Sequence, residues 1–327
     1  MSEWLTPLEK IKGLGKSFLS VLKGNGIKTV EAFIYRADEL GDLLPDLPQH
    51  KLTELTIEAL RLKRRWMVPA SEWAEVEKSQ IVFSTGSNAL NAILGGGVHS
   101  MYVAEFFGEY GVGKSQILNT IMVEGLAKYK DRTAIYIDCE KTFRYDRISE
   151  IASLRGYDPN DILNRTVLIR TEHTTDLLEV IKRLYLTVEA RKSVLVVCDS
   201  LISHLRAEFL GREMLAERQH MLLRILKRLQ SLASIYNIGV VISNQVVAVP
   251  TQTFTPFGDI KATGGHIMAH HTEPRVFVRK GTGKAGVSVR IARIEDSSWL
   301  PPAEATFRIT ERGVEDVKSG GVEVGKD

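Results

Sequence analysis

The residues best placed to do chemistry lie in one loop of spacing G-x-x-x-x-G-K-S, with the sequence Gly108-Glu109-Tyr110-Gly111-Val112-Gly113-Lys114-Ser115. An apolar run precedes this loop, and a helix-patterned segment follows it from Gln116. Glycines in such a loop let backbone N–H groups face phosphate oxygens, and the start of the helix adds a positive dipole. Lys114 would reach the β- and γ-phosphates, and the Ser115 hydroxyl would bind Mg²⁺. The loop therefore predicts a site for a nucleoside triphosphate with Mg²⁺.

Three other apolar runs end in polar side chains that could share this site. One run ends at Asp199, a second leads into Glu140, and a third ends at Gln245. Because ligands bind at the carboxyl ends of parallel strands, we expect these side chains to lie beside the phosphate loop. Asp199 could fix Mg²⁺ through water, Glu140 could deprotonate an attacking water, and Gln245 could sense the γ-phosphate. Alternatively, either acid could merely cap the helix that follows it.

The order of the apolar runs predicts the architecture. Continuous apolar runs alternate with helix-patterned segments, which is typical of a parallel sheet covered on both faces. The runs are 103–107, 134–137, 167–169, 194–198 and 239–243, and the helical segments include 116–128, 177–189 and 215–236. Beyond Arg275 the runs alternate apolar and polar residues, which indicates antiparallel strands at the sheet edge. We therefore predict an α/β core over residues 81–318, followed by a flexible tail, 319–327.

A small all-helical unit is predicted for residues 1–65. Its turn, Gly13-Leu14-Gly15, lies between helix-patterned segments with Lys12 and Lys16 beside it. Backbone N–H groups in such a turn can face a DNA phosphate, which is a helix-hairpin-helix pattern. The same turn is common where helices simply pack together. Both interpretations remain open at this point.

Residues 66–80 are predicted to link this unit to the core. The linker begins with the apolar, Pro-containing stretch 66–70. If Trp66 and Met67 are exposed there, they could anchor the chain on a neighbouring subunit, because buried aromatic residues dominate interface energies. Packing against the chain's own helical unit is the alternative.

Bulk properties limit the classes of protein to consider. A chain of 327 residues with 44% apolar and 25% charged residues is typical of a globular protein of about two domains. Cys139 and Cys198 cannot form a disulfide framework, and each lies in an apolar run, which indicates small buried side chains and a reducing compartment. Because the chain has no apolar run of about 20 residues and no signal peptide, we expect a cytoplasmic protein without membrane contact. A net charge of +3 is too small to indicate nucleic-acid binding by itself.

Several stretches together resemble one family, the RecA-type DNA strand-exchange recombinases, and within it archaeal RadA and its eukaryotic relatives. The stretches are 105–116, 137–147 (IDCEKTFRYDR), 197–219 (VCDSLISHLRAEFLGREMLAERQ), 243–247, 264–270 and 290–316. The likeness covers nearly the whole core from Ser84 and extends more loosely to the helical unit. It implies a RecA-like fold with ATP and Mg²⁺ as cofactors. It also implies a homo-oligomeric filament or ring whose partners are single-stranded DNA, homologous double-stranded DNA and recombination mediators.

The resemblance also implies roles for individual residues of the nucleotide site. It repeats the roles given above for the phosphate loop, Asp199, Glu140 and Gln245. Arg147 matches an arginine that stacks on adenine. The segment from Asp296 to Pro301 resembles a cap that a neighbouring subunit lays over ATP, and His270 resembles a γ-phosphate contact made across the same interface. The site would then be complete only between two subunits.

Two segments match DNA-binding loops of the family. The first, 205–218, contains Arg206, Arg212 and Arg218; the second, 246–265, contains Val247, Lys261, Gly264 and Gly265. The arginines could neutralise phosphates and make binding depend on salt. The alternative is that they are ordinary surface arginines.

Departures from the family pattern bear on the function. The family's Phe-x-x-Ala oligomerisation motif is replaced here by Trp66-Met67-Val68-Pro69, with Ala70 one position later. Val112 occupies a position that is often small, and Cys139 and Lys141 replace commoner residues. The main hypothesis is a DNA-dependent ATPase that forms filaments and exchanges DNA strands. The alternatives are a paralogue that assists filament assembly without exchanging strands, and a metabolic phosphate-loop kinase.

Overall fold

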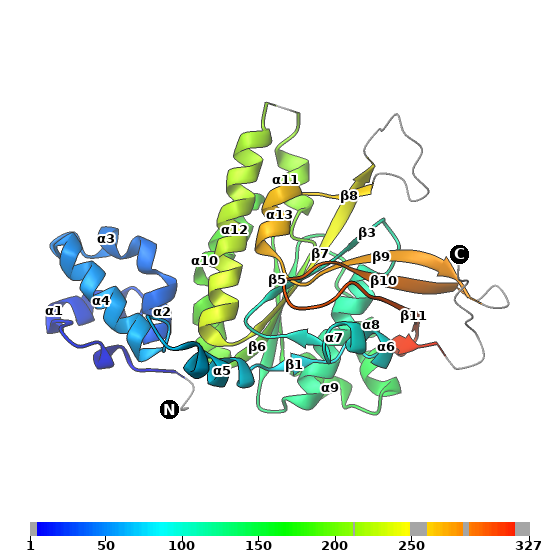
Figure 1. Ribbon diagram of the computed structural model, residues 1–327, viewed down its shortest axis with the longest axis horizontal. Helices are drawn as coiled ribbons and strands as arrows, with labels where there is room; N and C mark the ends of the chain where they lie inside the picture. The colour runs from blue at the N-terminus through cyan, green and yellow to red at the C-terminus, as the bar shows by residue number, and fades with distance from the viewer. Residues whose placement is uncertain (1–4, 212, 249–259, 284–287, 318–327) are drawn as a thin grey trace.

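The computed structural model describes residues 5–211, 213–248, 260–283 and 288–317. The described part consists of a small helical unit and a larger α/β core, which lie side by side (Figure 1). The predictions for Arg212, for the middle of the segment 246–265 and for the tail 319–327 fall outside these residues. No helix among the described residues has the length and apolarity needed to cross a membrane.

The N-terminal unit consists of short helices around an apolar centre. Its elements are η1 (Leu8–Lys10), α1 (Lys16–Gly24), α2 (Val30–Tyr35), η2 (Ala37–Glu39), α3 (Leu40–Leu43) and α4 (Gln49–Leu62). The Thr29 hydroxyl caps α2 by accepting a hydrogen bond from the Ala32 N–H over 3.0 Å. Gly13 has a φ of +85°, and Lys12 and Lys16 are exposed on either side of the turn. The turn is therefore accessible to a ligand.

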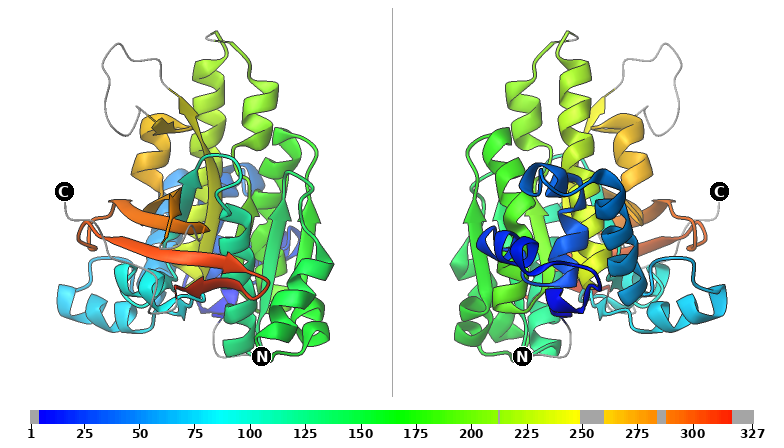
Figure 2. Two further views of the ribbon diagram at one scale, coloured as in Figure 1. Left: turned by 90° about the vertical axis from the view of Figure 1, so that its right-hand side faces the viewer. Right: turned by 90° about the vertical axis from the view of Figure 1, so that its left-hand side faces the viewer.

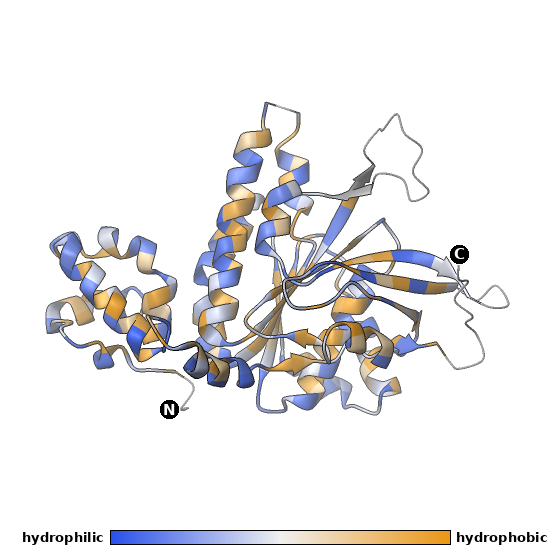
Figure 3. Cartoon of the chain, in the orientation of Figure 1, coloured by the Kyte–Doolittle hydropathy of each residue, from blue (hydrophilic) through white to orange (hydrophobic). Residues whose placement is uncertain are grey.

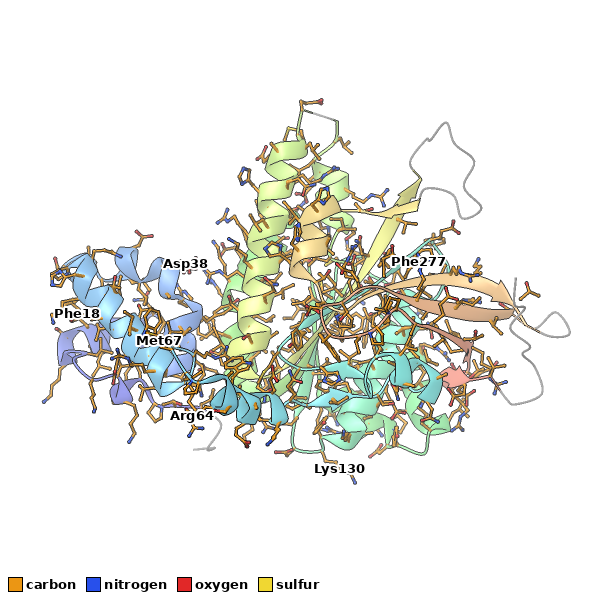
Figure 4. All side chains as sticks on the ribbon, viewed as in Figure 1. Phe18, Asp38, Arg64, Met67, Lys130 and Phe277 are labelled. Carbon is orange, nitrogen blue, oxygen red and sulfur yellow. The ribbon has the colours of Figure 1, made fainter. Side chains whose placement is uncertain are left out.

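Tyr35 is one of the residues that hold the helical unit against the core. Its hydroxyl donates to the Ile181 carbonyl over 2.6 Å, and its own carbonyl accepts from Arg228 over 2.7 Å. Burial raises the pKa of Tyr35. Arg228 also donates to Asp38 over 2.8 Å, and the Asp38 label in Figure 4 marks this junction. Apolar residues of both parts form one continuous buried cluster, so the unit is docked on the core.

The connecting segment contains a helix that the sequence pattern did not indicate. Helix α5 (Ala70–Lys78) follows Pro69, and none of its residues is buried. A proline just before a helix is compatible with its start, because proline lacks the N–H that would otherwise remain unpaired. Residues 66–69 thus form a short non-helical stretch before this helix, in which Met67 has a φ of +47°.

The core is built on a sheet of mixed direction whose strand order is β12-β11-β10-β9-β3-β7-β6-β4-β5. All pairs from β9 through β3, β7, β6 and β4 to β5 are parallel. The pairs β9–β10, β10–β11 and β11–β12 are antiparallel. Their bounds are β3 Val103–Gly108, β4 Thr133–Asp138, β5 Thr166–Arg170, β6 Ser193–Asp199, β7 Gly239–Ala248, β9 Arg275–Thr282, β10 Ser288–Asp296, β11 Glu304–Thr310 and β12 Gly313–Asp316. This arrangement confirms the predicted fold class.

Helices cover both faces of the sheet, as the continuous apolar strands predict (Figure 2). One face is packed by α10 (Thr174–Arg191), α11 (Ser203–Glu208), α12 (Leu215–Tyr236) and α13 (Gly265–His271), and the other by α6 (Asn88–Ile93), α7 (Lys114–Lys128), α8 (Tyr145–Leu154) and α9 (Pro159–Asn164). A short ribbon of β1 (Val82–Phe83) and β2 (Val98–His99) precedes β3. Figure 3 shows apolar residues concentrated on the central strands. The packing on both faces therefore holds the ends of these strands in place.

Both ends of the segment that follows Gln245 form β-strands. Strand β7 continues to Ala248 and pairs antiparallel with β8 (Ile260–Ala262). In this register Val247 is opposite Lys261. The prediction of one loop over 246–265 is therefore wrong at its two ends, because the polar and proline-containing sequence between them obscures the two short strands.

Candidate nucleotide site

The phosphate loop connects β3 to α7, as its motif predicts. Gly111 and Gly113 have φ values of +74° and +99°, which favour glycine. A Cβ on Gly108 would lie 2.1 Å from the Val278 carbonyl oxygen, and one on Gly113 would lie 2.1 Å from Ile309 Cδ1. The glycines are therefore required by backbone conformation and by close packing, which together shape a cradle of backbone N–H groups.

The Lys114 amino group points back into the loop. It donates to the carbonyl oxygens of Gly108 and Glu109 over 3.0 and 2.9 Å. Burial lowers the pKa of Lys114, while the charges of Asp199 and Glu140 oppose that shift. The positive charge of Lys114 therefore lies beside the glycine-rich loop, where it can pair with the phosphates of a nucleotide.

Two side chains of the phosphate loop, Tyr110 and Val112, lie on opposite sides of it. Tyr110 is 91% exposed, whereas Val112 is buried in the apolar cluster beneath the loop. The Val112 carbonyl accepts from Arg290 over 2.7 Å. Val112 therefore anchors the loop on the core, and its side chain does not fill the cradle.

Asp199 ends β6 and is almost fully buried. Its carboxylate accepts hydrogen bonds from the Tyr136 hydroxyl, over 3.0 Å, and from the Ser243 hydroxyl. Burial raises the pKa of Tyr136, and the neighbouring Asp199 charge raises it further. Two neutral donors thus orient the carboxylate without cancelling its charge, which suits a ligand of Mg²⁺ acting through water.

Glu140, Gln245 and Arg206 form a hydrogen-bonded chain. The Gln245 side chain donates its amide N–H to Glu140 Oε1 over 3.0 Å. Its carbonyl oxygen accepts from Arg206 Nη1 over 2.6 Å. Gln245 is opposite Gly108 in the β3–β7 register, so the chain begins at the phosphate loop. It ends on α11, in the first predicted DNA-binding segment.

Arg147 lies beside the start of α7. Its guanidinium donates to Gln116 Oε1 over 2.8 Å and to the Thr310 and Glu311 carbonyls over 2.5 and 2.8 Å. The planar group is therefore held by α7 and by the β11–β12 turn. A flat, oriented guanidinium at this place can stack on a base.

Three predicted nucleotide contacts are not gathered at this chain's own phosphate loop. His270 and Asp296 are exposed, and both line a cavity of about 510 Å³ between α12, α13 and the end of β10. In the sheet register, Asp296 is opposite Arg275, and Arg275 is opposite Glu105 of β3. Glu105 precedes Gly108, the first residue of the phosphate loop, by three residues. Pro301 is exposed in the turn before β11. This separation is what a contribution to a neighbouring subunit's site requires.

Four of the predicted DNA-binding residues, Arg206, Arg218, Val247 and Lys261, belong to two projections at one end of the molecule. The α11–α12 hairpin and the β7–β8 ribbon both protrude upward in Figure 1, and the side views agree (Figure 2). Arg206 is on α11 and faces Gln245, whereas Arg218 is in the first turn of α12. Gly264 has a φ of +97° and precedes α13, which begins at Gly265. The expectation that the whole segment 205–218 is a loop is corrected by these helices.

The predicted oligomerisation residues occupy the exposed junction between the two parts. Met67 is 89% exposed and Ala70 is exposed, whereas Trp66 is half-buried. Met67 is labelled in Figure 4, where it overlaps the ribbon of the helical unit. Met67 is thus a better placed anchor than Trp66.

Sequence reasoning missed a buried network under the site. Glu105 is fully buried in β3 and accepts from Arg275, Asn244 and Thr272 over 2.6, 2.7 and 3.0 Å. Asn244 also donates to the Thr263 carbonyl over 2.8 Å. The signal was present, because one carboxylate interrupts the apolar run 103–107. Such a residue needs partners when it is buried.

Comparisons with known proteins give the family. The Rad51 family profile matches residues 77–317. The chain is similar to the DNA repair and recombination protein RadA of Aeropyrum pernix, at 36% identity over 94% of this chain and 95% of that protein. It is similar to the human meiotic recombination protein DMC1/LIM15 homolog, at 35% identity over 94% of this chain and 91% of that protein. The resemblance found in the sequence is confirmed, and the chain belongs to the Rad51 family.

Proposed function

We propose that this protein is an ATP-dependent DNA recombinase that forms filaments on single-stranded DNA and exchanges strands with homologous duplex DNA. The observation that carries the proposal is the chain from Glu140 through Gln245 to Arg206, because it joins the nucleotide site to a predicted DNA-binding helix. Family membership supports it, and the relatives' names are those of recombination proteins. An assembly mediator is therefore not favoured.

ATP with Mg²⁺ supplies the phosphoanhydride bond and the metal charge that stabilises its cleavage. Lys114 and the loop N–H groups would hold the phosphates, and Ser115 and Asp199 would hold Mg²⁺, the latter through water. Glu140 would orient the attacking water and accept its proton. Arg147 would hold the base.

Arg206 would couple the two ligands. While it holds the Gln245 carbonyl, the Gln245 amide N–H occupies Glu140 Oε1, so the proposed base is already engaged. A DNA phosphate is a stronger partner for an arginine than a neutral amide. DNA binding would therefore draw Arg206 from Gln245, free Gln245 to contact the γ-phosphate and leave Glu140 available for water.

Filament growth would bring the separated contacts together. We infer that Met67 and Trp66 of one subunit dock on the exposed edge of the next subunit's sheet. Strand β5 is at the end of the described sheet, where it pairs only with β4. Beside it is a cavity of about 440 Å³ lined by Ile169, Val180 and Leu184, among others. This packing would let His270, Asp296 and Pro301 reach a neighbouring nucleotide.

The test is strand exchange by the purified protein with ATP and Mg²⁺. We expect joint molecules between homologous DNAs, filaments by electron microscopy and ATP turnover stimulated by single-stranded DNA. The variant Lys114→Ala should lose all three activities, while Lys128→Ala, at the other end of the same helix, should retain them. ATP-dependent filaments without joint molecules would instead support a mediator, and DNA-independent turnover would refute the proposal.

A further inference from the structure

The chain's two cysteines meet at the end of the sheet that carries the catalytic carboxylates. Cys139 follows β4 and Cys198 lies in the neighbouring strand β6, with their sulfur atoms 3.9 Å apart. Cys139 directly precedes Glu140, and Cys198 directly precedes Asp199. The two strands are joined here by a hydrogen bond from the Cys139 N–H to the Asp199 carbonyl over 2.9 Å.

The pair has a polar environment that an ordinary apolar core lacks. Thr171 donates its hydroxyl to Cys139 Sγ over 3.5 Å, and the same hydroxyl lies 2.9 Å from His204 Nε2. A proton can therefore move from the thiol toward the imidazole without crossing apolar surface. Cys139 keeps 5% of its surface exposed, whereas Cys198 has none. A small oxidant can thus reach Cys139 first, and Cys198 is placed as the second thiol.

We propose that Cys139 and Cys198 form a redox modification site, in which hydrogen peroxide converts the two thiols to a disulfide that suppresses ATP hydrolysis. Cys139 sulfur attacks one peroxide oxygen, the O–O bond breaks, and the thiol proton leaves with the other oxygen as water. Cys198 sulfur then attacks Cys139 sulfur, the S–O bond breaks, and the Cys198 proton leaves with that oxygen as a second water. Two thiols are oxidised and one peroxide is reduced.

The effect on catalysis follows from the position of the pair. A disulfide holds its sulfur atoms about 2.05 Å apart, so closure draws the ends of β4 and β6 together. Because each cysteine is bonded directly to a catalytic residue, Glu140 and Asp199 must move relative to each other. A displacement of about 1 Å in an active site can lower turnover on the order of 100-fold.

The experiment treats the purified protein with hydrogen peroxide, then measures its intact mass, its thiols after denaturation, and its ATP turnover before and after a reducing agent. We expect the loss of two hydrogen masses, no titratable thiol, and a roughly 100-fold fall in turnover that the reductant reverses. Cys139→Ser and Cys198→Ala each remove the pair, so either variant should keep its turnover after peroxide.

The proposal would be overturned by oxygen adducts without loss of two hydrogen masses, or by a disulfide that leaves turnover unchanged. Equal reversible inactivation of Cys198→Ala would also overturn it. The effect on turnover rests on the proposed function, whereas disulfide formation does not. If the untreated protein hydrolyses no ATP, the proposed function fails, and the mass measurement still decides whether the disulfide forms.

Discussion

Replacing Arg206 with Met tests the proposed coupling most directly. Methionine keeps the apolar stem and removes the guanidinium that donates to the Gln245 carbonyl over 2.6 Å. Hydrogen bonds to charged groups contribute about 1.5–3 kcal/mol, and because Arg206 is half-exposed we take the lower limit. That value corresponds to roughly tenfold in an equilibrium constant. The DNA-free protein should therefore release Gln245, and with it Glu140, about tenfold more often.

The assay is steady-state ATP turnover with and without single-stranded DNA. We expect Arg206→Met to raise DNA-free turnover about tenfold and to lower the stimulation by DNA by the same factor. Arg218→Met is the matched control, because Arg218 belongs to the same hairpin, whereas the contact with the Gln245 carbonyl is made by Arg206. It should weaken DNA binding and leave DNA-free turnover unchanged. The coupling argument is refuted if Arg206→Met also leaves DNA-free turnover unchanged.

Three further predictions follow from the same structure. Met67→Asp should lower the assembly mass measured by light scattering without changing thermal stability, because the side chain is 89% exposed. Val180→Asp, on the accepting surface, should also lower the assembly mass, together with some stability because Val180 is half-buried; an unchanged mass in both variants would exclude this contact. Burial raises the pKa of Glu189 above its ordinary 4.5, so the folded state binds more protons and stability should fall as pH rises from 4.5 through the folded-state pKa. Glu189→Gln should remove that slope in urea unfolding, and an unchanged slope would contradict the assignment. Tyr35→Phe should cost about 1 kcal/mol by removing a buried hydrogen bond between the helical unit and α10, whereas Tyr145→Phe, on an exposed tyrosine, should change unfolding by less than about 0.5 kcal/mol; equal effects would show that the Tyr35 hydroxyl does not hold the helical unit.

The sequence predicted the parts of the molecule that depend on local pattern. The phosphate loop, the parallel strands and the positions of Asp199 and Glu140 at strand ends follow from motif spacing and apolar periodicity, because a strand's carboxyl end is fixed once its run is recognised. Strand β12 was missed, since its four residues, Gly313–Asp316, carry two acids and are too short to show a period. Helix α5 was missed because none of its residues is buried.

The pattern of apolar residues could not predict the register between neighbouring strands. Cys139 and Cys198 were each predicted to be small buried side chains, and both are buried. Their 3.9 Å separation depends on how β4 and β6 are aligned, which no single run of residues determines. The contact of Arg206 with Gln245 likewise requires the position of α11 relative to β7.

The base of the β7–β8 ribbon has a consequence for how this protein can change. The Thr263 N–H donates to the Gln245 carbonyl over 2.9 Å, and Asn244 holds the Thr263 carbonyl, so the chain leaves and re-enters the sheet at one fastened point. Doubling the length of a closed excursion costs only about 0.6 kcal/mol in closure entropy. Peptide tags, fluorescent reporters and natural insertions placed between Ala248 and Ile260 should therefore be accepted without displacing Gln245.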